Sequence, residues 1–197
     1  MALPIPTSLL VRPVGRSHVA VRLIARIIEK ATRQQMLVPR VLGWYPKAAF
    51  SSGAMEGLVC HGEGRATARL LQLVRIQVSL QTGCPFCVEM NTSDLDSHAV
   101  TQQELDAILR GDPDCDTFSR HEVAALRYTR NLTSTPPVID PDLADELTLL
   151  FSERELVIVS TTVAQVNYWA RLLQGLGIPP ACPIPQSTRR GRRSASA

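Results

Sequence analysis

The chain has few aromatic residues and no long apolar run. Aromatics make up 5% of its 197 residues, and no segment approaches the roughly 20 apolar residues that a membrane helix needs. No secretory hydrophobic region opens the chain, and the five cysteines lack the spacing of a disulfide framework. The net charge of +3 is small, and the basic residues are spread along the chain. We therefore expect a cytoplasmic protein from a reducing compartment that binds neither membranes nor nucleic acid.

Acidic residues are also missing from the start of the chain, where Glu29 is the first. An arginine-rich, acid-poor start can mark an organellar transit peptide, but apolar residues at helical spacing favour an amphipathic helix over 17–35. Three prolines before it predict an extended lead-in over 1–16. The arginine cluster Arg189–Arg193 lies in a Ser- and Ala-rich end, so 181–197 is predicted to be a disordered tail.

Alternating strand patterns are scarce, whereas signals for helix starts are frequent. Three segments fit the S/T-x-x-E capping box, beginning at Thr101, Ser119 and Ser152. Asp140-Pro141 is typical of an N-cap followed by proline in the first turn. Further helices are expected over 48–60, with Phe50, Met55 and Leu58 turned inward, and over 65–82. The sequence predicts one all-α domain over 17–180.

A faint internal repeat accompanies these helices. Gln72-Leu73-Val74 stands twelve residues before Cys84, and Glu155-Leu156-Val157 stands twelve residues before Asn167. Both segments continue as long aliphatic helices. This similarity suggests a helical bundle built from two related helical hairpins.

The segment Gly83-Cys84-Pro85-Phe86-Cys87 carries the clearest chemistry. Gly83 ends one helix and Pro85 suits the first turn of the next, so the thiols are predicted at a helix N-terminus. Backbone N–H groups there stabilise a thiolate, and two thiols one turn apart can close a disulfide. Dithiol redox chemistry is the preferred interpretation. Inert core thiols and a zinc site remain open, although zinc needs further ligands and only Cys60-His61 is nearby.

The run from Gln72 to Asn91 resembles the carboxymuconolactone decarboxylase superfamily, in its AhpD-like alkylhydroperoxidase branch. The motif of that branch is a glutamate, eleven residues, C-x-x-C, three residues and a histidine. The resemblance covers about 48–95 well and extends more loosely to 151–175. It implies an all-helical fold that assembles as homo-trimers or hexamers. It also implies an antioxidant peroxidase that uses a redox-active disulfide and needs no cofactor or metal.

The resemblance implies a role for each cysteine. Cys87 would attack a small hydroperoxide and become a sulfenic acid, and Cys84 would resolve it to a disulfide. Cys84 would lie nearer solvent, open to a dithiol reductant that is lipoyl or thioredoxin-like. The chain departs from the motif because Gln72 replaces the relay glutamate and Asn91 replaces the relay histidine. Neither amide can serve as a general base.

Two other functions stay open because of these replacements. One is a helical oligomer that has lost catalysis and acts as a binding or accessory protein, and the other is a lyase of the decarboxylase type. Four other side chains could supply the missing base: Glu89, His98, His61 and Glu155. Glu89 is predicted to point away from Cys87, His98 to lie on the surface, His61 in a solvated loop, and Glu155 in a capping box. The aromatic pairs Trp44-Tyr45 and Tyr168-Trp169 are expected in the core or at subunit interfaces.

Overall fold

A computed structural model describes residues 9–14, 19, 23, 26, 34–35, 37–58, 62–111, 116–180 and 182–183. The described residues form α2 (Val38–Leu42), α3 (Pro46–Leu58), α4 (Ala68–Gln81), α5 (Pro85–Thr92), the 3₁₀ turn η1 (Asp96–His98), α6 (Gln102–Arg110), α7 (Arg120–Thr133), α8 (Pro141–Leu150) and α9 (Glu153–Leu176). The predicted all-α architecture is confirmed. Within these ranges, no helix is both long and apolar enough to cross a membrane.

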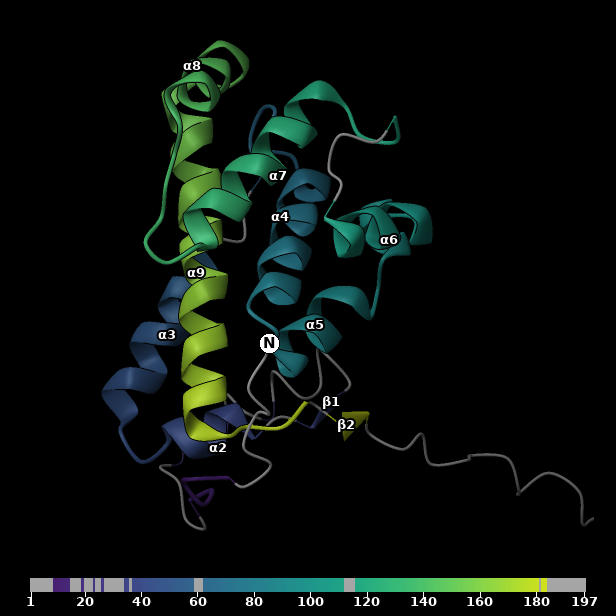
Figure 1. Ribbon diagram of the computed structural model, residues 1–197. Helices are drawn as coiled ribbons and strands as arrows, with labels where there is room; N and C mark the ends of the chain where they lie inside the picture. The colour runs from purple at the N-terminus through teal and green to yellow at the C-terminus, as the bar shows by residue number, and fades with distance from the viewer. Residues whose placement is uncertain are drawn as a thin grey trace, which may run out of the picture.

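Helix α4 is the centre of the bundle, with α5, α6, α7 and α9 packed around it (Figure 1). Its apolar residues point in all directions and are almost completely buried: Leu70, Leu71, Leu73, Val74, Ile76 and Val78. A helix that is apolar on every side has to be enclosed by other elements. One side of α4 joins a core shared with α7, α8 and α9, and the opposite side joins a core shared with α6 and α7.

The predicted helix starts are confirmed. Thr101, Ser119 and Ser152 each form a capping box with the glutamate three residues later. Asp140 Oδ1 accepts a hydrogen bond from Leu143 N at 2.8 Å, ahead of Pro141 in the first turn of α8. Helix α4 begins later than expected, because Thr67 is its N-cap and accepts a hydrogen bond from Leu70 N.

Two predictions about the first part of the chain were wrong. Gln34–Gln35 forms a short antiparallel strand, β1, with β2 (Cys182–Pro183), where a helix to residue 35 was expected. The pairing joins segments far apart in the chain, so no local pattern indicates it. Phe50 is 53% exposed instead of buried, while the side chain of Leu58 lies outside the described residues.

Helices α4 and α9, which carry the two halves of the sequence repeat, pack side by side (Figure 1). They differ at the point where the cysteines lie. Helix α9 runs without interruption for 24 residues, whereas the first unit breaks after Gln81 and restarts as α5. The break creates the candidate site.

Candidate active site

The chain reverses between α4 and α5 through a Schellman motif. The Gly83 N–H donates to the Leu80 carbonyl at 3.1 Å, and the Cys84 N–H donates to the Ser79 carbonyl at 3.2 Å. Gly83 adopts φ +60°, a left-handed conformation that glycine takes without the steric cost of a side chain. The same turn that ends α4 therefore delivers Cys84 directly to the start of α5.

Cys84 is the N-cap residue of α5 and Pro85 occupies the first turn, as the sequence predicted. The Cys87 N–H donates to Cys84 Sγ at 3.3 Å. The two sulfur atoms are joined in a disulfide, with the Cα atoms 5.3 Å apart. Backbone donors at a helix N-terminus stabilise negative charge, so the position favours the thiolate form of Cys84 when the bond is reduced.

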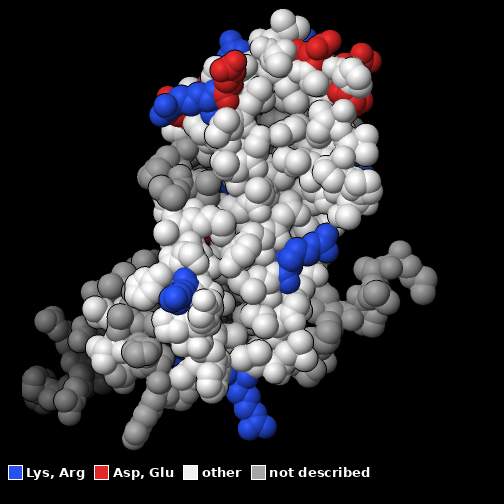
Figure 2. All heavy atoms as spheres, turned by 90° about the vertical axis from the view of Figure 1, so that its left-hand side faces the viewer, with Lys and Arg blue, Asp and Glu red and all other residues white. Residues whose placement is uncertain are grey.

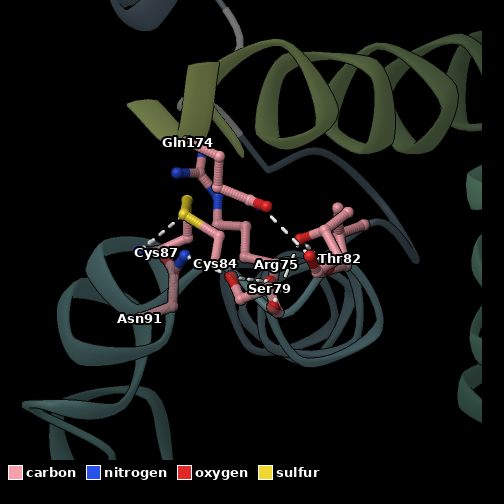
Figure 3. Close-up of a disulfide and its surroundings, with 8 residues drawn as sticks. Arg75, Ser79, Thr82, Cys84, Cys87, Asn91 and Gln174 are labelled. Atoms are coloured by element: carbon pink, nitrogen blue, oxygen red, sulfur yellow. Dashed lines mark hydrogen bonds between the residues drawn. A yellow bond between two sulfur atoms is a disulfide. The ribbon is translucent and has the colours of Figure 1, made fainter. Parts of the chain in front are cut away.

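The two cysteines differ in access, and in the opposite sense to the expectation. Cys84 is 0% exposed, whereas Cys87 is 4% exposed and lines a cavity. The prediction that Cys84 lies nearer solvent was therefore wrong. Cys84 follows the Schellman turn directly and is enclosed between α4 and α9, where Gln174 Nε2 donates to the Thr82 carbonyl at 3.1 Å (Figure 3).

Gln72 and Asn91, at the relay positions, do lie together. Gln72 Nε2 donates to the Asn91 backbone carbonyl at 2.6 Å, and Asn91 Nδ2 donates to Ser79 Oγ at 3.0 Å. Ser79 Oγ in turn donates to the Arg75 carbonyl (Figure 3). These bonds fasten the second half of α5 to α4. In the described part of the chain, the bonds of these two amides end on oxygen atoms and not on a sulfur.

The cavity beside Cys87 has a volume of about 960 Å³, within the range of small-molecule sites. Its walls are mainly apolar and come from α2, α3, α5 and α9: Val38, Leu42, Ala49, Phe50, Phe86, Met90, Val166, Trp169 and Leu173. Gly53 and Gly57 line it without contributing a side chain, and a Cβ at either would meet nothing within 4 Å. The cavity therefore suits a ligand with a largely apolar body.

Polar groups of the cavity include a cluster that the sequence analysis missed. Trp169 Nε1 donates to Glu56 Oε2 at 2.9 Å, and Gln165 Nε2 donates to the same oxygen. Arg75 NH1 lies 3.7 Å from Glu56 Oε1. Trp169 is thus a cavity residue and more than a core anchor. The local sequence offers one indication of this cluster. Two glycines on α3, Gly53 and Gly57, flank the single acidic residue of that helix.

The remaining candidate bases have separate outcomes. Glu89 is exposed, as expected. His98 lies in η1 but is half-buried and lines the cavity, so the surface prediction was wrong. Glu155 forms its capping box and also accepts from the Arg65 N–H, which lowers the pKa of its carboxyl. Cys60 and His61 lie outside the described residues. Elsewhere in the chain as described, no three histidine, cysteine or acidic side chains gather as metal ligands would.

Comparison of the sequence with protein families matches residues 48–131 to the carboxymuconolactone decarboxylase family. The chain is 32% identical over 107 residues to the uncharacterized protein YdfG of Bacillus subtilis (strain 168), covering 54% of this chain and 72% of that protein. The family match over residues 48–131 contains both cysteines, both relay positions and Glu56.

Solved structures share the fold. An uncharacterized peroxidase-related protein with an alkylhydroperoxidase AhpD core, from Ralstonia eutropha JMP134, has a TM-score of 0.74 and 14% identity. That match covers 91% of this chain and 94% of the other. The debrominase Bmp8, in complex with 2,3,4-tribromopyrrole, has a TM-score of 0.74 and 18% identity, covering 87% and 91%. At these identities the similarity establishes the architecture alone.

Proposed function

Because the chain belongs to the carboxymuconolactone decarboxylase family, in its AhpD-like branch, we propose that it is a dithiol oxidoreductase. Its substrates are small organic hydroperoxides, which Cys87 and Cys84 reduce to alcohols. The observation that carries the proposal is the pair itself: two cysteines that join in a disulfide at a helix N-terminus, with one sulfur facing an apolar cavity. The apolar walls favour an organic hydroperoxide over hydrogen peroxide.

The oxidative half-reaction begins at Cys87. Its thiolate attacks the terminal oxygen of the hydroperoxide, the O–O bond breaks, and the alkoxide leaves and takes up a proton as the alcohol. Cys87 is then a sulfenic acid. Cys84 attacks that sulfur as a thiolate, the hydroxyl leaves as water with a proton, and the disulfide forms. The Cys87 N–H, which donates to Cys84 Sγ, assists this step by stabilising the attacking thiolate.

The reductive half-reaction uses the same entrance. A dithiol donor, lipoyl or thioredoxin-like, attacks the sulfur that it can reach, and the cavity exposes Cys87. Cys84 leaves as the stabilised thiolate, and the second donor thiol releases Cys87 and closes a disulfide on the donor. Because Cys87 is only 4% exposed, a slender donor such as a lipoyl arm suits the site better than a folded protein. Substrate and donor then compete for one cavity.

Thiolate formation in this scheme depends on the helix N-terminus. Gln72 and Asn91 hold α5 in place but cannot accept a proton near neutral pH. Activation of the thiols therefore relies on their position at the N-terminus of α5 and not on a Glu–His relay.

A second candidate is reductive removal of a halogen from an aromatic ring, which the volume of the cavity and the aromatic residues Phe50, Phe86 and Trp169 in its walls favour. In that reaction the Cys87 thiolate takes the halogen from carbon and the ring gains a proton. Cys84 then displaces halide as the disulfide forms, so the electrons again come from the dithiol. Fold similarity to Bmp8 places this reaction among those worth assaying.

The experiment is a turnover assay with cumene hydroperoxide and dihydrolipoamide, followed by the same assay with tribromopyrrole. Cys87→Ser should abolish turnover, and Cys84→Ser should stop after one event with a sulfenic acid on Cys87, detected by dimedone labelling. Cys115→Ser is the matched control and should retain wild-type activity. Unchanged turnover in Cys87→Ser refutes the proposal. Ordinary thiols that do not pair, with no turnover on either substrate, favour the binding or accessory role.

We also propose that the chain acts as a homo-oligomer, a trimer or hexamer, in the cytoplasm. The face formed by α3 and α9 carries few charged side chains (Figure 2). Exposed apolar residues on these two helices include Phe50, Val157 and Tyr168. An uncharged face with exposed apolar side chains is typical of a subunit interface.

A further inference from the structure

The carboxylate of Glu56 is held by side chains from two other helices. Its Oε2 atom accepts hydrogen bonds from both Trp169 Nε1 and Gln165 Nε2, two donors on α9. Two donors on one oxygen fix the plane of the carboxylate, and Arg75 from α4 lies beside the other oxygen. Three helices therefore cooperate to hold one side chain at the wall of the cavity that contains Cys87.

Gln165 shows that this arrangement has a cost. The side chain is 2% exposed, and its Oε1 atom has no hydrogen-bond partner among the described residues. A buried acceptor without a partner loses the hydrogen bond that water gives it in the unfolded chain. Turning the amide over would bring its carbonyl against the Glu56 carboxylate, so the bond to Glu56 dictates the orientation. An apolar residue would fill this buried position without that cost. The hydrogen bond from Gln165 to Glu56 accounts for a glutamine here.

We propose that Glu56 and Arg75 form a recognition site for a hydrogen-bonding group of a neutral ligand, carried on an apolar body that reaches from there toward Cys87. A carboxylate beside a guanidinium offers an acceptor and donors side by side, which matches a hydroxyl or a similar neutral group. The apolar remainder of the ligand lies against the walls that lead to Cys87: Phe86, Met90, Trp169 and Leu173. This inference rests on the proposed function and names the substrate class of the same cavity.

The charged side chains of the cavity disfavour anionic ligands. Among the residues that the structure describes, two carboxylates (Glu56 and Asp94), one arginine (Arg75) and one histidine (His98) line the cavity. An anionic ligand, such as a fatty acid carrying a hydroperoxide, would meet Glu56, and Arg75 is already paired with that carboxylate. The site therefore selects neutral molecules with a donor over carboxylates of the same size.

The test uses three probes of matched shape: para-hexylphenol, its methyl ether para-hexylanisole, and para-hexylbenzoate. Binding is measured by calorimetry on full-length Cys87→Ser protein, so that no turnover is required. We expect the phenol to bind about tenfold more tightly than the ether, and the benzoate to bind most weakly. Glu56→Gln should weaken the phenol about tenfold, leave the ether unchanged, and strengthen the benzoate, because the repulsion between two carboxylates is removed.

Glu89→Gln is the matched control, since Glu89 is an exposed carboxylate on α5 that does not line the cavity. It should leave all three affinities unchanged. Equal binding of phenol and ether to Glu56-containing protein overturns the inference, as does an equal loss of all three probes in Glu56→Gln. Failure of the peroxidase assay would leave this binding pattern intact, so the two proposals fail separately.

Discussion

Arg69 joins two buried carboxylates, and its replacement by methionine tests what holds α4 to α6 and α7. Arg69 Nε donates to Glu122 Oε1 at 2.8 Å, and a second guanidinium nitrogen pairs with Glu104. A third bond reaches the Ala99 carbonyl. Glu104 is 4% and Glu122 7% exposed. Each glutamate is also the last residue of a capping box, so one arginine links two helix starts to α4.

The expected loss of stability is about 3 kcal/mol at pH 7. Removing one partner of a buried ion pair costs about 3–5 kcal/mol, since the remaining charge has no compensation. The lower end of this range applies for two reasons. Both carboxylates keep the hydrogen bonds of their capping boxes, from the N–H of Thr101 at 2.7 Å and of Ser119 at 2.9 Å. Arg69 itself is partly accessible to water.

The loss should depend on pH in a defined direction. Burial raises the pKa of Glu104 and Glu122, but hydrogen bonds from Arg69 and the N-cap residues outweigh it, so both values lie below the ordinary one. A carboxyl with a lowered pKa stabilises the folded state above the unfolded pKa of about 4.3, and this stability disappears as the pH falls through the folded value. Protonated carboxyls do not need Arg69, so the loss should shrink to about 1 kcal/mol in strong acid.

The measurement is urea unfolding of the wild type and Arg69→Met, followed by circular dichroism at pH 7 and again at acid pH. The matched control is Arg154→Met, which breaks an exposed pair with Glu63 at 2.8 Å and should cost less than about 1 kcal/mol at any pH. A loss below about 1 kcal/mol for Arg69→Met at pH 7, or a loss that stays constant with pH, would refute this account of the network.

Three further predictions concern the joints of the fold, the relay position and the interface. Gly64→Ala should lower the free energy of unfolding by more than about 1 kcal/mol, since Gly64 has φ +57° and a Cβ would approach Glu155 Oε1. Gly175→Ala, at a position on α9 where a Cβ would meet open space, should raise the free energy of unfolding by about 0.5–1 kcal/mol. Thermal melts measure both glycine variants. Gln72→Glu should cost about 1–3 kcal/mol, because the new carboxylate faces the Asn91 carbonyl, and a gain in stability would contradict the fastening role. Val157→Asp should shift the mass measured by light scattering toward the monomer, whereas a wild type that is already monomeric would end the oligomer proposal.

Features that depend on neighbouring residues could be predicted from the sequence. A capping box needs only residues three apart, and Thr101, Ser119 and Ser152 all form one. The reversal at Gly83 and the N-cap role of Cys84 are likewise encoded within six residues. Features that depend on distant segments could not be predicted. The relative exposure of Cys84 and Cys87 depends on α9, and the pairing of β1 with β2 joins the two ends of the domain.

The contacts of Gln72 and Asn91 show what these two amides do in the fold. Gln72 and Asn91 occupy the places of an acid and a base, but their amides hold two helices together, and a carboxylate at position 72 would weaken that bond. One carboxylate that lines the cavity, Glu56, comes from α3 and is fixed by donors on α9 more than a hundred residues away in sequence. A motif defined along α4 and α5 alone cannot contain Glu56. If Glu56 recognises the ligand, an acidic group of the site lies on α3, outside the motif, and activity has to be sought with neutral substrates first.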